Sequence, residues 1–367
     1  MKPYIPVELP INNLDYRSLI SLVGEANAEL ARYDGLLQGI VNPSILLSPL
    51  TTQEAVLSSR IEGTQASLDE VLEMEAGIQM SDEKSKDIAE IINYRKALVY
   101  GSEKVKESQL SMYVIRELHK ILLDGVRGAN KSPGDFRKEQ NWIGTPGTPM
   151  ELASFIPPSP MILIEHLEKF EKYIESNDID PLIQTSLIHA QFELIHPFLD
   201  GNGRIGRLLI PLFLYKKGML SSPMFYLSSY LEANREIYYA GLNAISREGN
   251  WDNWVRFFLR AIAEQSKKNS QLIHQIMDLY KQKKEIISNL LHSQYSIKVV
   301  DALFHMPVFN STQFIHWANI PKNTAMPLLR TLKKNEVVTV FRESSGSQPA
   351  VYIFPKLINI TEGKKLY

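Results

Sequence analysis

Apolar residues recur at helical spacing through most of the chain, which predicts a mainly α fold. Ser48-Pro49 begins one such stretch, because proline is favoured in the first turn of a helix, and Gly63 ends it. Ser67 and Glu70 have the spacing of a capping box, so a second helix begins there. Further helices are predicted over residues 84–105, 111–124, 181–195, 203–217, 232–247 and 251–290.

The helical pattern breaks over residues 128–160, which are rich in glycine and proline with aromatic and β-branched residues between them. Such a composition is typical of loops around a short hairpin. The two strands of this hairpin are predicted near Asn141–Ile143 and Ala153–Ile156.

The last part of the chain has a pattern of its own. Three helical stretches, at 296–305, 311–318 and 322–335, precede the segment VVTVF, a polar turn and the segment AVYIF. This is the element order of a winged helix-turn-helix, in which Asn310-Ser311-Thr312 would cap the second helix. The third helix would present the residues available for phosphate or base contacts, namely Lys322, Asn323, Arg330, Lys333 and Lys334.

Charge supports a separate role for this C-terminal module. Residues 291–367 contain nine Lys or Arg and four Asp or Glu, a net charge of +5, whereas the whole chain has a net charge of −1. A basic module suits DNA as a partner. Winged helices also bind proteins, so both kinds of partner stay open.

Whole-chain composition narrows the class of protein. Apolar residues make up 44% and charged residues 22% of the chain, which is typical of a globular protein. The absence of cysteine excludes a disulfide scaffold and a thiolate metal site. The N-terminal segment lacks a signal-peptide pattern, and no run approaches the roughly 18 apolar residues of a membrane span. We therefore expect a cytoplasmic protein without a membrane partner.

The segment HPFLDGNGRIGR, residues 196–207, carries the strongest chemical signal. Gly201 and Gly203 permit backbone conformations in which successive N–H groups converge, and the helix that follows adds the partial positive charge of its N-terminus. This combination is typical of a phosphate site. Arg204 and Arg207 are three residues apart, so both guanidinium groups lie near the same helix end, which suits a polyphosphate.

Two further residues of this segment supply other chemistry. Asp200 is a hard oxygen ligand for a Mg²⁺ ion that bridges phosphates, and His196 titrates near neutrality and can act as a general base. Each residue alone has an ordinary structural explanation, as a turn, a cap or a solvated face. Base, acid, glycine loop and paired arginines within twelve residues together favour a nucleotide site.

These residues match the Fic motif, HPFx(D/E)GNGRxxR, at every specified position, so the sequence resembles the Fic family of protein adenylyltransferases. The resemblance implies a helical core around the motif, with ATP and Mg²⁺ at the site. It implies that His196 deprotonates the target hydroxyl, which attacks the α-phosphorus, and that Asp200 holds Mg²⁺ between the α- and β-phosphates. Gly201, Asn202 and Gly203 would bind phosphate oxygens, Arg204 the β-phosphate and Arg207 the γ-phosphate.

Two other segments resemble parts of Fic proteins. Gly134–Arg137 and Ala153–Pro158 match the elements that flank the flap, a hairpin that in this family pairs with the backbone of the target segment. Tyr238 and Tyr239 are adjacent on a predicted helix, so they point in different directions and at least one packs in the core. By resemblance, Tyr239 lies on the adenine side of the ATP site.

The segment SSRIEG, residues 58–63, matches the inhibitory motif (S/T)xxxE(G/N) that some Fic proteins carry upstream of the core. The resemblance implies that Glu62 pairs with Arg207 and takes the place of the γ-phosphate. ATP would then bind only in a bent, unreactive pose.

We interpret the sequence as a protein adenylyltransferase that transfers AMP from ATP to a Tyr, Thr or Ser hydroxyl of a target protein, itself included, and that is autoinhibited by Glu62. Two alternatives stay open: a DNA-binding regulator whose Fic core only senses nucleotide, and removal of AMP by the same site. A homo-oligomer is a further expectation. The expected domains are an N-terminal helical region at 1–110 with the inhibitory helix at about 48–63, the Fic catalytic core at 111–250, connecting helices at 251–290 and the winged helix domain at 291–367.

Overall fold

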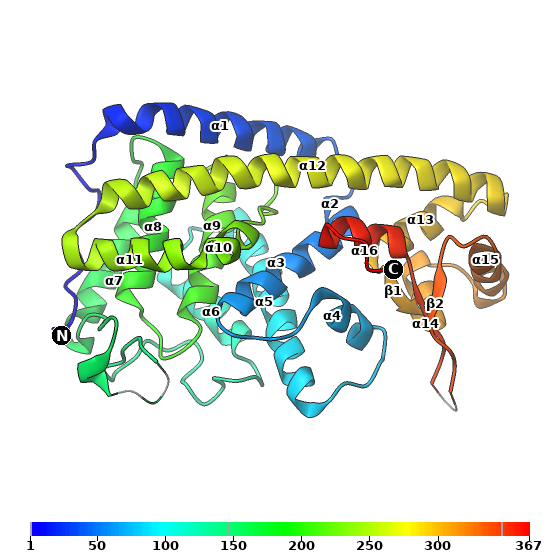
Figure 1. The fold of residues 1–367 in the computed structure, drawn as a ribbon, viewed down its shortest axis with the longest axis horizontal. Coiled ribbons are helices and arrows are strands. Elements are labelled where there is room, and N and C mark those ends of the chain that lie inside the picture. Colours follow the sequence, from blue (N-terminus) through cyan, green and yellow to red (C-terminus); the bar gives the residue numbers. More distant parts are fainter. Residues whose placement is uncertain (1, 146, 148, 346–347) are drawn as a thin grey trace. The chain divides into compact units, whose positions relative to one another are not determined.

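The computed structural model describes residues 2–145, 147, 149–345 and 348–367. Helices dominate it and its strands form one small sheet, so the mainly α fold class is confirmed (Figure 1). The helices are α1 (Tyr16–Gln38), α2 (Pro43–Leu46), α3 (Ser48–Ile61), α4 (Leu68–Glu75), α5 (Asp82–Glu107), α6 (Met112–Leu122), α7 (Pro160–Glu175), α8 (Pro181–Ile195), α9 (Asn202–Lys216), α10 (Ser228–Ala233), α11 (Arg235–Glu248), α12 (Trp251–Leu291), α13 (Ser296–His305), α14 (Ser311–Ala318), α15 (Lys322–Lys334) and α16 (Pro355–Glu362).

The chain forms two compact units. The first contains Met1–Gly35, Leu57–Gly63 and Ile92–Lys267, and the second contains Leu36–Val56, Thr64–Ile91 and Lys268–Tyr367. The chain passes from one unit to the other within α1, α3, α5 and α12, and in the loop after Gly63. The short stretch 57–63, which holds the predicted inhibitory motif, belongs to the first unit together with the HPFLDGNGRIGR segment.

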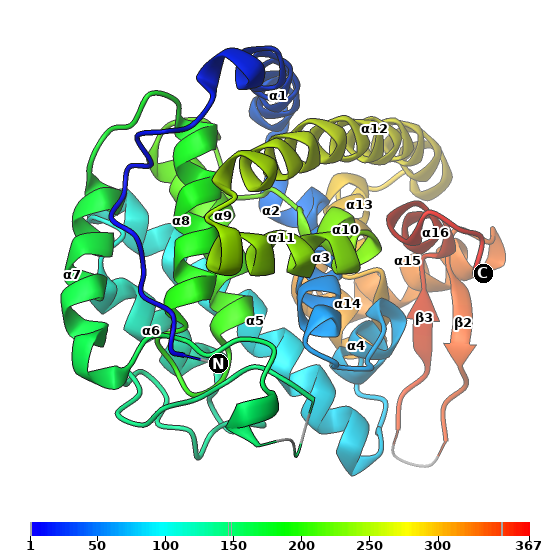
Figure 2. The same ribbon diagram turned by 60° about the vertical axis from the view of Figure 1, so that its left-hand side comes forward.

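Helices α8 and α9 form the buried centre of the first unit. Every residue of α8 from Leu182 to Ile195 is buried, and so is every residue of α9 from Asn202 to Leu214. Asp180 caps α8 by accepting hydrogen bonds from the N–H groups of Leu182 and Ile183. The two helices pack against each other, with α7 and α11 against α8 and α6 against α9 (Figure 2). The loop between α8 and α9 is therefore held by two rigid elements.

The segment predicted as a hairpin folds back on itself, but it pairs at a single point. Ile143 donates its N–H to the carbonyl of Phe155 at 2.9 Å, and the N–H of Ser154 donates to the Ile143 carbonyl at 2.8 Å. The two predicted strands are reduced to this isolated bridge. Pro157 and Pro158 lack the N–H groups that a longer ladder needs, so pairing ends there. The tip contains residues 146 and 148, which lie outside the described residues.

The C-terminal part of the second unit has the predicted order of elements. Helices α13, α14 and α15 are followed by the hairpin of β2 (Thr339–Arg342) and β3 (Val351–Ile353), and β1 (Val308–Asn310) completes an antiparallel sheet of order β1-β3-β2. Asn310 caps α14 and accepts a hydrogen bond from the Gln313 N–H at 3.0 Å, as predicted. The short helix α16, for which the sequence pattern predicted nothing, follows the hairpin.

Helix α4 packs against this sheet. Leu68 and Leu72 of α4, with the C-cap residue Ala76, share a core cluster with residues of β1, β3 and α16. The side-chain amides of Asn310 and Gln313 donate to the carbonyls of Ala76 and Glu75, at 3.0 Å and 2.6 Å, and so satisfy the end of α4. The C-terminal module therefore includes an element that follows the inhibitory motif closely in the sequence. Within the described residues, no helix combines the length and the apolar composition that crossing a bilayer would need.

Candidate functional site

The loop between α8 and α9 takes its shape from two residues with left-handed backbone conformation. His196 ends α8 with φ +50°, and Gly201 caps α9 with φ +76°. Glycine adopts this conformation without strain, whereas it is uncommon for a residue with a side chain such as histidine. The loop is therefore a constrained structure rather than a passive connection.

Asn202 closes this loop from the inside. Its side-chain oxygen accepts a hydrogen bond from the Phe198 N–H at 2.9 Å, and its side-chain amide donates to the Phe198 carbonyl at 2.8 Å. Both polar atoms of the side chain are thus used within the loop. A contact between Asn202 and phosphate, which the family resemblance implies, therefore falls to its backbone N–H in the first turn of α9.

Two residues outside the loop brace it. Neither role was predicted from the sequence. His119 of α6 accepts a hydrogen bond from the Gly134 N–H on Nδ1 at 2.9 Å, so its Nε2–H donates to the Asp200 carbonyl at 2.9 Å. Its ring stacks on Phe198 with the centroids 3.7 Å apart. Burial lowers the pKa of His119 to about 4, so the ring stays neutral as this bonding pattern requires. A histidine on the core-facing side of an amphipathic helix is the sequence signal that points to such a brace.

Arg137 is the second brace. Its buried guanidinium donates to the carbonyls of His196 at 2.9 Å and Pro158 at 2.6 Å. It thereby joins the start of the loop to the end of the flap segment. From the sequence, Arg137 is predicted only to belong to a segment that resembles an element beside the flap of Fic proteins.

His196 is oriented as a base. Its Nδ1–H donates to the Glu193 carbonyl at 3.2 Å, which leaves Nε2 without a proton. Burial lowers the pKa of His196 to about 4, and the Glu193 carbonyl only partly offsets this effect. The ring is therefore neutral at physiological pH and can accept a proton on Nε2.

Asp200 lies at the far end of the loop and keeps 37% of its side chain exposed. Its Oδ1 accepts the Gly201 N–H at 2.6 Å and lies 3.8 Å from Nη2 of Arg204, whose side chain is buried. Gly128 lies close to it, and a β-carbon there would come within 2.8 Å of Oδ2. The described residues contain no cluster of three or more acidic, histidine or cysteine side chains that could hold a metal by themselves. A single open carboxylate fits Mg²⁺, which commonly takes one or two protein carboxylates and completes its shell with phosphates and water.

Glu62 and Arg207 are far apart in sequence and form an ion pair. Nη2 of Arg207 lies 2.7 Å from Oε1 of Glu62. The Arg207 side chain is 1% exposed, whereas that of Glu62 is 31% exposed. The same carboxylate covers the first turn of α9, because a β-carbon on Gly203 would lie only 2.1 Å from Oε1. The predicted partners are thus in direct contact at the helix N-terminus.

The serine of the inhibitory motif completes this contact. Arg207 donates from Nε to Oγ of Ser58 and from Nη2 to the Ser58 carbonyl, both at 2.9 Å. Burial would raise the pKa of Glu62, but the charge and hydrogen bond of Arg207 outweigh burial and hold it below its usual range. The pair is therefore ionised at physiological pH, and the motif spacing between Ser58 and Glu62 corresponds to one arginine held by both.

These side chains meet in a cavity of about 710 Å³. Five of the predicted site residues line its wall. The other predicted site residues lie in the adjoining loop and in the first turn of α9. Tyr238 is buried and Tyr239 is 37% exposed, so one of the two adjacent tyrosines packs in the core, as predicted, although both contribute to the cavity wall. The cavity residues predicted from the sequence are Glu62, His196, Gly203, Arg207 and Tyr239.

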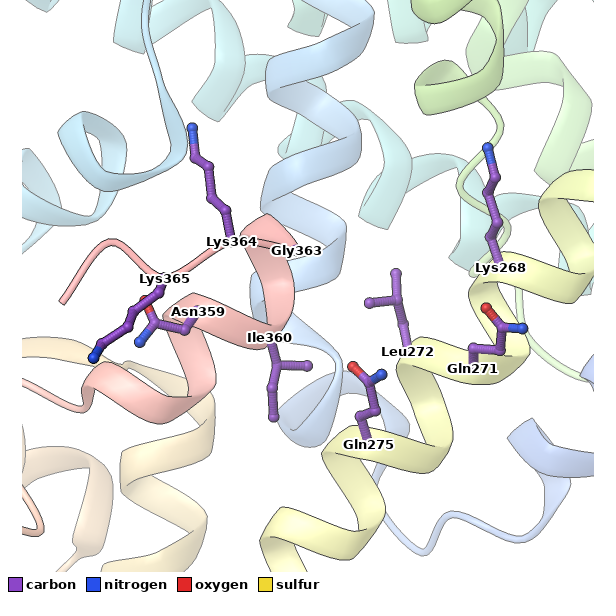
Figure 3. Close-up of a pocket in the computed structure, with 9 residues that line it drawn as sticks. All are labelled: Lys268, Gln271, Leu272, Gln275, Asn359, Ile360, Gly363, Lys364 and Lys365. Atoms are coloured by element: carbon purple, nitrogen blue, oxygen red, sulfur yellow. The ribbon is translucent and has the colours of Figure 1, made fainter.

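A second hollow lies within the second unit, between α12 and α16 (Figure 3). Lys268, Lys364 and Lys365 lie around it, together with polar and aliphatic side chains. It contains no residue of the Fic motif or of the inhibitory motif. The residues of these two motifs that line a hollow therefore lie in the cavity of the first unit.

Comparison with known proteins agrees with this geometry. The N-terminal domain of the Fic/DOC family matches residues 20–103, and the Fic/DOC family domain matches residues 109–214. Together the two matches cover more than half of the 367 residues. The second match contains the loop, and the first contains the segment with Ser58 and Glu62.

Curated relatives carry names that fit the family. The protein adenylyltransferase Fic of Drosophila grimshawi is 28% identical over 284 residues, which are 71% of this chain and 50% of that protein. A probable protein adenylyltransferase of Aquifex aeolicus is 29% identical over 197 residues, 52% of this chain and 56% of that protein. The chain thus spans about half the length of the curated relatives it matches. Among solved structures, a Fic family protein from Desulfovibrio desulfuricans G20 shares the fold with a TM-score of 0.62, at 18% identity and over 96% of this chain and 98% of that one.

Proposed function

Since the chain belongs to the Fic/DOC family, we propose that it is a protein adenylyltransferase that transfers AMP from ATP to a hydroxyl side chain of a target protein. The observation that carries the proposal is a proton-accepting nitrogen beside a phosphate cradle in one cavity. Nε2 of His196 provides the base, and the α9 N-terminus with Arg207 provides the cradle. Phosphoryl transfer depends mainly on alignment and charge neutralisation, which such a site supplies.

Each residue of the site has a place in this reaction. Backbone N–H groups at Asn202 and Gly203 bind phosphate oxygens, whereas the N–H of Gly201 is held by Asp200, and Arg204 binds the β-phosphate. His196 takes the proton from the target hydroxyl as its oxygen bonds to the α-phosphorus and the bond to pyrophosphate breaks. Arg207 binds the γ-phosphate and keeps the pyrophosphate in line with the attacking oxygen.

Mg²⁺ fits this site through Asp200. The ion would neutralise charge on the phosphates, and the exposed Asp200 carboxylate would hold it next to the loop. His119 holds the Asp200 carbonyl, and the Gly201 N–H holds Oδ1 of Asp200. These two hydrogen bonds orient the side chain before nucleotide binds.

Replacing Asp200 by alanine is expected to abolish both transfer and its dependence on Mg²⁺, because the single protein carboxylate for the ion is lost. Transfer from ATP is measured in a Mg²⁺ titration, with Asp135→Ala as the control, since Asp135 is an exposed carboxylate of the same unit. An unchanged Mg²⁺ requirement in Asp200→Ala would show that the ion is held elsewhere.

We propose further that Glu62 inhibits the enzyme. Its carboxylate neutralises Arg207 and occupies the space directly over Gly203, where a phosphate oxygen would otherwise lie. ATP that binds beside it cannot place its γ-phosphate on Arg207, so its α-phosphorus is out of line with the target hydroxyl. Incubation of Glu62→Gly protein with ATP labelled at the α-phosphate and a cell lysate tests the transfer, and labelled protein bands are the expected result. Absence of label from both the lysate proteins and the enzyme would reject the activity.

DNA binding by the C-terminal module is a second candidate function. All five side chains predicted for DNA contact lie on α15, two in its first turn and three toward its C-terminal end, and all are exposed. They present positive charge without acidic residues between them on α15. These residues are Lys322, Asn323, Arg330, Lys333 and Lys334.

Replacing Lys333 and Lys334 together by alanine is expected to weaken DNA binding and to leave AMP transfer unchanged. Each lost phosphate contact lowers the slope of log affinity against log salt by about one unit. Binding to duplex DNA is measured over a salt series, with the exposed pair Lys281→Ala and Lys284→Ala of α12 as the control. If the unmodified protein shows no salt-sensitive DNA binding, the module binds a protein instead.

A further inference from the structure

Glu193 is a buried carboxyl group that the reaction described above does not use. It lies in α8, one turn before His196, and only 8% of the residue is exposed. Its side chain forms part of the wall of the 710 Å³ cavity, but Oε1 is buried and has no hydrogen-bond partner. A buried polar group without a partner is unfavourable, so its retention in a ligand cavity points to a partner that arrives with the ligand.

The neighbouring helix is adapted to this side chain. A β-carbon on Gly206 would lie 2.2 Å from Oε1 of Glu193, so only glycine leaves room for the carboxyl group against α9. Gly206 directly precedes Arg207, and its carbonyl accepts a hydrogen bond from His189 at 3.0 Å. The carboxyl group is therefore packed against the same turn of α9 that carries the γ-phosphate ligand.

The charges that face Glu193 favour its neutral form. Arg207 is the nearest cation, but Glu62 and Ser58 already satisfy it. Tyr238 and Tyr239 of α11 face the carboxyl group. The hydroxyl of Tyr238 is hydrogen-bonded to Nε2 of His189 at 3.0 Å. The pKa of Glu193 is raised to about 8, mainly by burial; the charge of Arg207 opposes this rise and the charge of Glu62 adds to it. On its own helix, His196 is neutral.

We propose that Glu193 is a specificity residue of the nucleotide site, which in its acid form donates a hydrogen bond to an oxygen of the terminal phosphate of ATP. This inference rests on the proposed function, because it assumes that Arg207 receives that phosphate once Glu62 withdraws. A neutral carboxylic acid is a strong donor to a phosphate oxygen. An ionised carboxylate at the same place repels the phosphate and competes with it for Arg207.

The consequence is a pH dependence of ATP affinity. Below its pKa, Glu193 carries the proton that it donates, and the affinity for ATP is at its highest. As the pH rises through that pKa, ATP must bind to a carboxylate or restore the proton, and affinity falls. Removing Glu62 takes away one cause of the raised pKa, so in a Glu62→Gly background the fall begins at or below about pH 8.

The test measures ATP affinity by calorimetry between pH 6 and pH 9 in the Glu62→Gly protein and in two double variants. In Glu62→Gly, affinity is expected to fall by about tenfold over this range, since one proton is linked to binding. Adding Glu193→Gln should abolish most of this dependence, because the amide donates a hydrogen bond and never ionises. Adding Glu193→Leu should also flatten the dependence but weaken ATP at pH 6. Glu168→Gln, an exposed carboxyl on α7, is the matched control and should leave the dependence intact.

The same series with ADP separates the terminal phosphate from the rest of the ligand. ADP lacks the γ-phosphate, so its affinity should change little between Glu62→Gly and the Glu193→Gln double variant. An equal pH dependence with and without Glu193, or an equal effect of Glu193 on ATP and ADP, would overturn the proposal. Labelling from α-labelled ATP separates this inference from the proposed function. If ATP binding depends on Glu193 as predicted but no protein becomes labelled, this inference is supported and the transferase activity is rejected.

Discussion

Replacing Glu62 by glycine raises the rate of AMP transfer from ATP by about 10–100-fold. A charge-assisted pair such as Glu62 with Arg207 is worth roughly 1.5–3 kcal/mol, and about 1.4 kcal/mol is tenfold in rate or occupancy. The arginine is buried and its partner covers Gly203, so removal of the carboxylate frees both the charge and the space for the γ-phosphate. Labelling with α-labelled ATP at equal protein and Mg²⁺ concentrations measures the gain.

Removing the other end of the same contact has the opposite outcome. Arg207→Ala also breaks the pair, but it deletes the γ-phosphate ligand and leaves the Glu62 carboxylate beside the phosphates. Glu62→Gln is the graded control, because it keeps the shape of the side chain and loses its charge. Equal labelling of wild type and Glu62→Gly would reject the inhibitory role, and a gain in Arg207→Ala would show that this arginine does not position the nucleotide.

Replacing His196 by alanine lowers AMP transfer by about 10²–10⁴-fold, which is typical of the loss of a general base. ATP binding should persist, because the phosphate cradle is built from the α9 N-terminus and the loop is closed by Asn202 and His119. Transfer and ATP affinity are measured separately, so the change should appear in the rate and not in the dissociation constant.

The pH profile offers an independent check on His196. Its pKa of about 4 means that the base is neutral above that value, so protonation of His196 causes no loss of transfer between pH 7 and pH 5. His166→Ala, on α7 outside the cavity, controls for the general effect of losing a histidine. Near-normal transfer in His196→Ala at neutral pH would contradict the assigned role.

The sequence predicted the central helices and the loop well, because their signals are local. Asp180-Pro181 marks the start of α8, and the glycines mark the turn into α9. The resemblance to the inhibitory motif brought Glu62 and Arg207 together correctly, although 145 residues separate them. The helix ends follow from the residue type at one position, whereas the ion pair follows only from the resemblance of two segments to known motifs.

The remaining features depend on contacts that no local pattern contains. Helix α7 begins with Ser159-Pro160 at the end of the stretch 128–160 that composition predicts as loops, and no element was predicted for residues 161–180. The predicted hairpin has only one β-bridge in the described residues, because prolines end its pairing. The roles of His119, Ser58 and Glu193 follow from what their side chains touch across helices, and an isolated buried polar residue does not reveal its partner.

Parallel labelling of the Glu62→Gly protein with ATP that carries the label at either the α- or the γ-phosphate distinguishes transfer of AMP from transfer of phosphate. The α-label is expected to become covalently attached to protein and the γ-label is not, and His196→Ala in the same background is expected to remove the α-label. Attachment of the γ-label would show that the site transfers phosphate instead of AMP. Attachment of neither label would contradict the assignment of a transferase.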